Sequence, residues 1–184
     1  MSEHKETLHI HRTHPIILGG DPEDEGNITF VPKLQHAELC TFWNRKILEL
    51  KSSLEIKNKR EPDRQVLKGF PVTIEFAESF LKVEFPNIFR KYLQSTNGVE
   101  GEFQNQYLNL WGLAELVQLN EAYNVQEFAP NLLLFGSDGG EDAFAFERST
   151  MHIVRIPFIG MSYVAIEKIA DSFTDFLGVY FGND

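Results

Sequence analysis

Basic residues are missing from a long central part of this sequence. Between Lys91 and Arg148 there is no lysine, arginine or histidine, whereas nine residues are acidic. Such a segment repels nucleic acid and anionic membranes, because both carry negative charge, and it attracts basic molecules. The same segment is rich in core-forming apolar residues, so we predict a folded surface of negative charge. We therefore expect a basic protein as partner, and neither nucleic acid nor a membrane.

Cysteine and long apolar runs are also scarce. Cys40 is the single cysteine, so no disulfide can form within the chain. No apolar run approaches the roughly 20 residues that a membrane-spanning helix needs. Residues 1–14 are polar and lack the apolar stretch of a secretory signal. From these absences we expect a cytoplasmic protein.

The composition and the charge distribution together predict two regions. The chain has 184 residues, of which 42% are hydrophobic, enough for one domain with an extension. Residues 1–67 contain 10 basic and 11 acidic residues, whereas residues 68–184 contain 7 and 16. Residues 57–65 between them are charged and contain a proline, which is typical of a linker. We predict an N-terminal extension over residues 1–66 and a domain over residues 67–184.

The extension is predicted to contain two short strands and one long helix. Residues 7–11 alternate between polar and apolar, and residues 28–31 can form a second strand before Pro32. Residues 34–56 contain neither proline nor glycine, and their apolar residues recur at spacings of three and four. This spacing predicts an amphipathic helix whose apolar stripe docks on the rest of the chain or on a partner. The stripe consists of Leu39, Phe42, Trp43, Ile47 and Leu50.

In the domain, helices are predicted first and most strands later. Thr73 can cap a helix that ends before Pro86, and Asn87 can cap a second helix that ends at Asn97-Gly98. A strand is predicted over residues 107–110 and a helix over residues 112–123. Strands over 132–135, 143–146 and 152–156 are expected to be consecutive in one antiparallel sheet, and a helix over 169–180 closes the chain. This order predicts an α+β fold with a mainly antiparallel sheet packed against helices.

Few residues offer catalytic or metal-binding chemistry. His9 and His11 would project from one face of a strand, a geometry that can bind zinc or copper, but no carboxylate or cysteine completes a set at a defined spacing. Cys40 is interpreted as a small core residue of the long helix. The sequence therefore predicts no catalytic residue, no cofactor and no metal site, and a protein that is not an enzyme. An enzyme or metal protein built on the histidine-rich N-terminus is the third alternative.

Turns in the acidic segment hold most of the residues that we expect to contact a partner. Side chains on or beside turns are exposed, and loops commonly carry recognition. Tryptophan is enriched at binding hot spots, although a packing role is the alternative for Trp111. The alternative for the acidic residues is that they only keep the protein in solution. The predicted partner-binding residues are Glu100, Glu102, Trp111, Glu141, Asp142 and Glu147.

A series of short motifs over residues 71–181 recurs in the order and spacing of a known superfamily. The motifs are a capped helix running into Phe85-Pro86, residues 89–93 leading to Asn97-Gly98, residues 108–110, a helix with Glu115-Leu116 and Asn120, residues 128–136, 138–140, 143–146 and 169–173, and Phe176-Leu177. In these motifs the chain resembles the SUKH superfamily, the fold of the Smi/Knr-type fungal cell-wall assembly regulators and their bacterial relatives. Residues 1–65 lie outside the resemblance.

The resemblance implies a non-enzymatic α+β binding domain without shared catalytic residues. Bacterial members are often immunity proteins that neutralise a toxin, frequently a nuclease, by direct binding. A nuclease must be basic to hold nucleic acid, so an acidic inhibitor has complementary charge. The implied partner is a cognate basic toxin. The alternative is a regulatory scaffold in cell-envelope synthesis or signalling, as in the fungal relatives.

Overall fold

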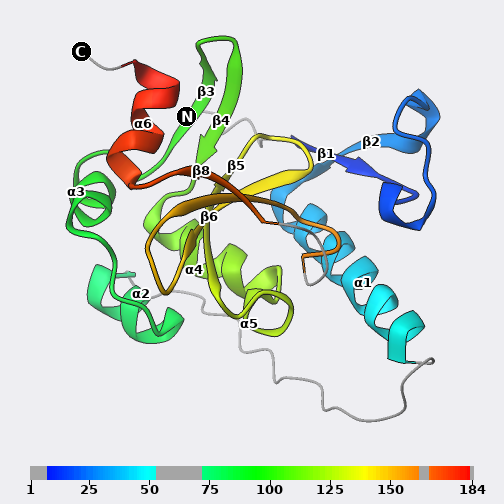
Figure 1. Ribbon diagram of the computed structural model, residues 1–184, viewed down its shortest axis with the longest axis horizontal. Helices are drawn as coiled ribbons and strands as arrows, with labels where there is room; N and C mark the ends of the chain where they lie inside the picture. The colour runs from blue at the N-terminus through cyan, green and yellow to red at the C-terminus, as the bar shows by residue number, and fades with distance from the viewer. Residues whose placement is uncertain (1–7, 53–71, 162–165, 183–184) are drawn as a thin grey trace, which may run out of the picture.

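The N-terminal extension forms a two-stranded ribbon followed by a long helix (Figure 1). The computed structural model describes residues 8–52, 72–161 and 166–182. Strands β1 (Leu8–Arg12) and β2 (Ile28–Pro32) pair antiparallel, and two 3-10 turns, η1 (Ile16–Leu18) and η2 (Glu25–Asn27), lie in the loop between them. Helix α1 (Lys33–Ser52) follows directly. Both predicted strands and the helix are confirmed, whereas the predicted helix end over 53–56, the linker over 57–65 and the boundary at residue 66 lie outside the described residues.

The domain consists of one six-stranded antiparallel sheet with helices packed against it, so the predicted α+β class is confirmed. The strand order is β3-β4-β5-β6-β7-β8, and every neighbouring pair is antiparallel. No helix among the described residues is long and apolar enough to cross a membrane. The elements are α2 (Ile74–Leu81), α3 (Asn87–Ser95), β3 (Val99–Phe103), β4 (Gln106–Leu110), α4 (Leu113–Ala122), α5 (Val125–Phe128), β5 (Leu132–Ser137), β6 (Asp142–Glu147), β7 (Ile153–Pro157), β8 (Glu167–Ala170) and α6 (Phe173–Phe181).

Most predicted helix boundaries follow from local chemistry. The Thr73 hydroxyl accepts a hydrogen bond from the Phe76 N–H at 3.2 Å, as predicted for the cap of α2. Helix α3 starts at Asn87 after Pro86, but the Asn87 side chain does not cap it, because Asn87 is already helical. The chain leaves α3 through Asn97 and Gly98, whose φ angles of 52° and 110° lie in the left-handed region.

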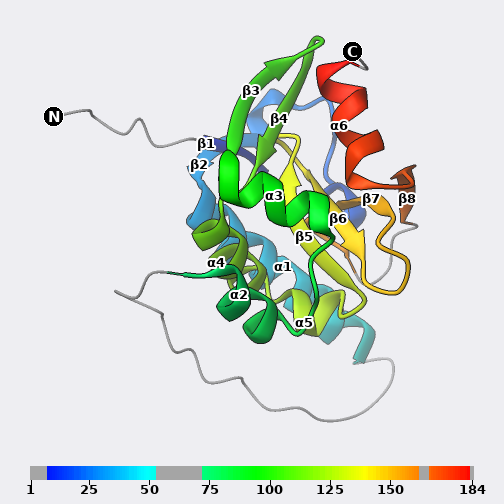
Figure 2. The same ribbon diagram turned by 90° about the vertical axis from the view of Figure 1, so that its left-hand side faces the viewer.

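Two strands were not predicted. The closing helix was expected from residue 169, but residues 167–170 form β8, and α6 begins only at Phe173. The Ser172 hydroxyl accepts from the Asp175 N–H and caps α6, so the helix cannot extend further back. Strand β3 was also missed, because Gly101 interrupts its apolar pattern. It forms a hairpin with β4 that projects from the sheet (Figure 2), with Gln104 and Asn105 at positive φ in the turn.

Both faces of the sheet are covered. In β6, Phe144 and Phe146 point to one face, and the alanines at 143 and 145 point to the other. Phe89 of α3 and Phe176 of α6 pack on the first face, with ring centroids 5.0 Å from Phe146 and 5.1 Å from Phe144, respectively. Both alanines are also fully buried, and α4 packs on β5 and in turn contacts α1 and α2. Double coverage explains why β5 is buried along its whole length.

Helix α1 docks through a more polar face than the one predicted. Of the predicted apolar stripe only Ile47 is buried, whereas Phe42 and Leu50 are 50% and 57% exposed. The face that is buried contains His36, Ala37, Cys40, Thr41, Asn44 and Ile47. Hydrogen bonds to distant backbone groups decide this orientation, because they satisfy the polar side chains. The Asn44 amide donates to the Phe158 carbonyl at 2.8 Å and accepts from the Gly160 N–H at 2.6 Å.

Candidate functional site

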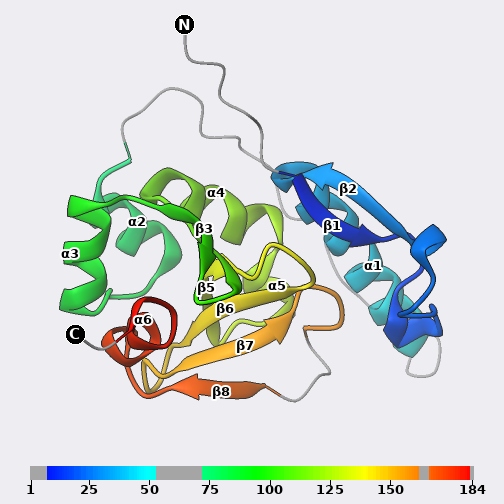
Figure 3. The same ribbon diagram turned by 90° about the horizontal axis from the view of Figure 1, so that it is seen from above.

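Three cations of the extension contact the acidic segment. The extension lies beside the sheet (Figure 3), and its basic side chains reach glutamates in β3, α4, α5 and the loop before β6. The segment that lacks its own cations therefore receives them from residues far away in the sequence. The pairs, with their N–O distances, are Arg12–Glu141 (2.8 Å), Lys33–Glu115 (3.0 Å), Lys33–Glu100 (3.6 Å) and Arg45–Glu127 (3.9 Å).

The predicted partner-binding acids do not form one patch. Glu100 and Glu102 project from the same side of β3, which is an outer strand of the sheet. Asp142 begins β6 and lies 3.8 Å from Arg155, whereas Glu147 ends the same strand. At the usual rise per residue, the two ends of the six-residue strand β6 are about 17 Å apart. Glu147 is therefore remote from Asp142 within the sheet.

Glu102 differs from Glu100, its neighbour on the same side of β3. Its residue is exposed, and among the described residues its carboxylate has no basic nitrogen within the 4 Å that defines an ion pair. Glu100, two residues earlier, accepts a hydrogen bond from the Tyr107 hydroxyl and pairs with Lys33. Glu102 is thus the acid on β3 whose charge is least compensated within the described part of the chain.

The prediction that Trp111 faces a partner requires correction. Trp111 is 0% exposed, and its ring stacks on Tyr123 with the centroids 6.2 Å apart and the planes 5° apart. Its position directly after β4, where the chain turns under the sheet into α4, places it in the core. Trp111 therefore packs in the core, which was the alternative considered for this residue.

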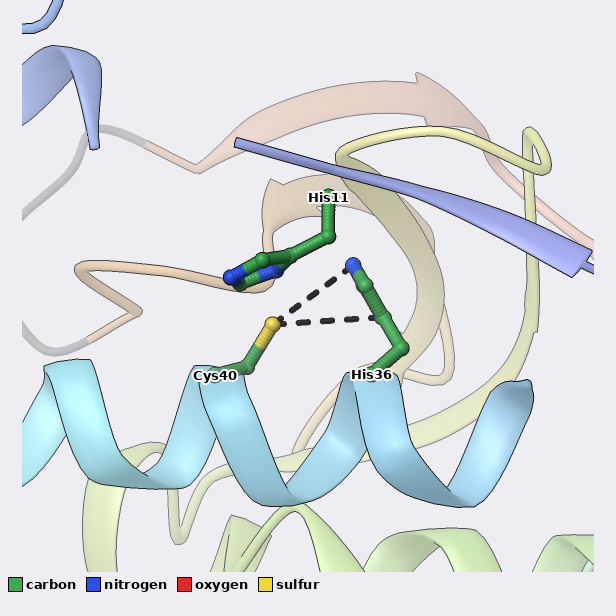
Figure 4. Close-up of side chains that lie close together, drawn as sticks. All are labelled: His11, His36 and Cys40. Atoms are coloured by element: carbon green, nitrogen blue, oxygen red, sulfur yellow. Dashed lines mark hydrogen bonds between the residues drawn. The ribbon is translucent and has the colours of Figure 1, made fainter. Parts of the chain in front are cut away.

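A second polar cluster lies buried between the ribbon and α1 (Figure 4). His11 of β1 points towards α1, where His36 and Cys40 are one helical turn apart and point back towards the ribbon. One ring nitrogen of each histidine and the sulfur of Cys40 all lie within 4.8 Å of one another. Each of the three residues is at most 3% exposed. The Cys40 Sγ lies 3.6 Å from His36 Nε2, and the rings of His11 and His36 meet edge to face at 5.4 Å.

The surroundings of the cluster keep its histidines neutral. Burial, and secondarily the neighbouring His9 and His11, lowers the pKa of His36 to about 3, and burial lowers the pKa of His11 as well. The His36 Nδ1 is hydrogen-bonded to the Tyr123 hydroxyl at 2.8 Å. Burial also raises the pKa of the Cys40 thiol well above its ordinary value.

The cluster is not suited to nucleophilic catalysis. A reactive cysteine needs a lowered pKa and access for its substrate, and it commonly pairs with a charged histidine. Cys40 is 0% exposed with a raised pKa, and His36 is neutral. The sequence did contain a signal for this cluster, since His36 and Cys40 are four residues apart on a predicted helix and therefore share one face.

The family comparison agrees with the resemblance described above. The model of the SMI1 / KNR4 family (SUKH-1) matches residues 71–178, which is more than half of the chain. The chain therefore belongs to the SMI1 / KNR4 family (SUKH-1). The match includes every element of the six-stranded sheet and excludes the ribbon and α1. A search of curated proteins found no match.

Proposed function

We propose that this chain is a non-enzymatic protein-binding domain, an immunity protein that neutralises a basic, nuclease-type toxin by direct binding. Membership of the SMI1 / KNR4 family supports a binding role. The uneven charge supports a basic partner, because residues 92–147 contain nine acids and no base. The competing role, a regulatory scaffold in cell-envelope synthesis or signalling, would give no protection against a toxin.

The observation that carries the proposal is the exposed acid on the outer strand β3. Glu102 lies on the projecting hairpin of β3 and β4 (Figure 2), and, unlike Glu100 and Glu141, it has no ion pair to the extension among the described residues. A basic partner that approaches this hairpin meets a negative charge that no cation of the described residues pairs with. Long-range attraction of this kind mainly accelerates association.

Charge reversal of Glu102 tests the proposed surface better than reversal of Glu141 or Asp142. Glu141 holds Arg12 and Asp142 lies beside Arg155, so their reversal would also disturb the fold. Glu102→Lys changes the charge by two units. At about 10 Å from a partner charge in water, this change amounts to ~0.8 kcal/mol, or about a fourfold slower association at low salt. Glu23→Lys is the matched control, because Glu23 is exposed in the loop between β1 and β2, far from β3 (Figure 3).

The resemblance to bacterial immunity proteins implies that the toxin is encoded beside its inhibitor, so the product of the neighbouring gene is the partner for this test. Co-expression should protect cells from that product, and the purified pair should associate with a salt-dependent rate. Glu102→Lys should slow association and flatten its salt dependence, whereas Glu23→Lys should leave both nearly unchanged. Failure to protect would exclude the immunity role. Protection with equal effects of the two variants would place the interface away from β3.

A further inference from the structure

The buried cluster between the ribbon and α1 has the composition of a transition-metal site. We propose that His11, His36 and Cys40 bind one Zn²⁺ ion, which joins β1 to α1. Imidazole nitrogen and thiolate sulfur are the ligands that Zn²⁺ prefers in proteins, and three protein ligands are sufficient when a fourth position remains open. The site lies outside the residues matched by the family and does not depend on the proposed function.

The unpaired nitrogen atoms point to a missing ligand. Nδ1 of His11 and both ring nitrogens of His9 are buried and have no hydrogen-bond partner among the described residues. Buried polar groups are normally satisfied, so a cluster with several unpaired imidazole nitrogens is unfavourable as plain core packing. A neutral imidazole has one nitrogen without a hydrogen, and this nitrogen carries a lone pair. A bound cation would use that lone pair, whereas a hydrogen-bond acceptor could not.

The spacing of the three side chains fits a zinc site after a small adjustment. Zinc bonds of about 2.0 Å to nitrogen and 2.3 Å to sulfur place tetrahedral ligand atoms about 3.3–3.7 Å apart. Cys40 Sγ and His36 Nε2 already have a separation of 3.6 Å, and no pair of ligand atoms in the set exceeds 4.8 Å. Binding therefore requires that the His11 ring approach by about 1 Å, and that the His36 ring turn so that its nitrogen faces the metal.

Tyr123 provides the outer support that a metal-binding histidine usually has. Its hydroxyl is hydrogen-bonded to Nδ1 of His36, so Nε2 is the ligand atom, and on binding the metal would replace the contact of this ring with the Ile10 backbone. Zn²⁺ with one thiolate has a net charge of +1, and the carboxylate of Glu141, which lines the same cavity and pairs with Arg12, lies close enough to lower the cost of that charge.

A partly enclosed cavity beside the cluster offers a metal ion a route of entry and room for a fourth ligand. His11, His36, Cys40 and Glu141 all line one cavity of about 340 Å³, together with apolar residues such as Ile16 and Phe158. Water in this cavity can occupy the fourth position. On binding, the Cys40 S–H bond breaks, an S–Zn bond forms, and the proton passes to the buffer.

Cobalt(II), which takes the same geometry as zinc, is the probe for the test. The full chain is freed of metal and titrated with Co²⁺ and then with Zn²⁺, while absorbance and bound metal are measured. The expected result is one Co²⁺ per chain with a thiolate-to-cobalt charge-transfer band, which Zn²⁺ abolishes. Because Cys40 is the single cysteine, this band in the wild-type chain identifies the ligand without any variant. Absence of the band with stoichiometric Co²⁺ would overturn the proposal.

Variants and a second ion separate this site from adventitious binding. Cys40→Ala should lose the band, and His11→Gln should weaken Zn²⁺ binding at least tenfold. His14→Gln is the matched control, since His14 is exposed just beyond β1, and it should bind like wild type. Zn²⁺ but not Mg²⁺ should raise the melting temperature of the wild-type chain, because Mg²⁺ prefers oxygen ligands. Equal stabilisation of wild type and Cys40→Ala by Zn²⁺, or loss of binding in His14→Gln, would contradict the assignment.

Discussion

Asn44 is the residue whose replacement best tests how the extension is attached to the domain. It lies on the buried face of α1 and is 3% exposed. Its side chain joins the helix to the backbone of Phe158 and Gly160, just after β7. Asn44→Ala removes both hydrogen bonds and leaves a buried carbonyl and a buried N–H without their partner.

The expected loss of stability follows from these two bonds. Each backbone group left unsatisfied costs about 1–3 kcal/mol, and the small cavity adds to this. Because alanine has a higher helix propensity than asparagine, the replacement also restores about 0.5 kcal/mol of stability. We therefore expect Asn44→Ala to lower the free energy of unfolding by about 2–5 kcal/mol. Glu38→Ala, an exposed position on the same helix, is the matched control and should change it by less than about 0.5 kcal/mol.

Urea unfolding followed by tryptophan fluorescence measures this effect and locates it. Trp43 lies on α1 and Trp111 in the core of the domain, so the chain has one reporter in each part. Trp43→Phe leaves Trp111 alone, and comparison of the two backgrounds shows whether α1 detaches before the sheet unfolds. A loss in Asn44→Ala no larger than in Glu38→Ala would refute the docking of α1 through its polar face.

Two further predictions concern the family domain. The hydrogen bond from Arg90, and secondarily the N–H of Phe85, holds the pKa of Glu78 below its ordinary value. This carboxylate therefore stabilises the fold above about pH 4.3, and its contribution is lost as the pH falls through the lower pKa of the folded state. Glu78→Gln should thus be less stable than wild type at about pH 7, with the difference shrinking as pH falls below about 4.3 in urea titrations, and a constant difference would contradict the pairing. Gly139 has a φ of +77°, and an added Cβ would lie 2.4 Å from the Tyr107 ring. Gly139→Ala should cost at least about 1 kcal/mol in the same assay, whereas Gly140→Ala, without these constraints, should cost clearly less.

Local signals in the sequence were sufficient for most of the domain. Alternation predicted the strands around residues 132–156, because each is bounded by a short turn and pairs with its neighbour in the chain. The cap at Thr73 and the left-handed pair Asn97-Gly98 marked helix ends, since these features act within a few residues. Strands β3 and β8 were not predicted, because β3 contains a glycine and β8 has exposed residues, so neither shows a clear apolar alternation. Pairing with β4 and β7, respectively, makes them strands.

Contacts between distant residues decided the rest. The apolar stripe of α1 was visible in the sequence, but hydrogen bonds to distant residues determine which face is buried. His36 bonds to Tyr123, 87 residues away, and Asn44 bonds to Phe158, 114 residues away. The acidic character of residues 92–147 is a property of composition, and the sequence determined it alone. Only the tertiary structure showed that Arg12, Lys33 and Arg45 compensate part of that charge, and that His11 meets His36 and Cys40. Charge and periodicity are sums over neighbouring residues, whereas compensation and ligand geometry depend on which segments the fold brings together.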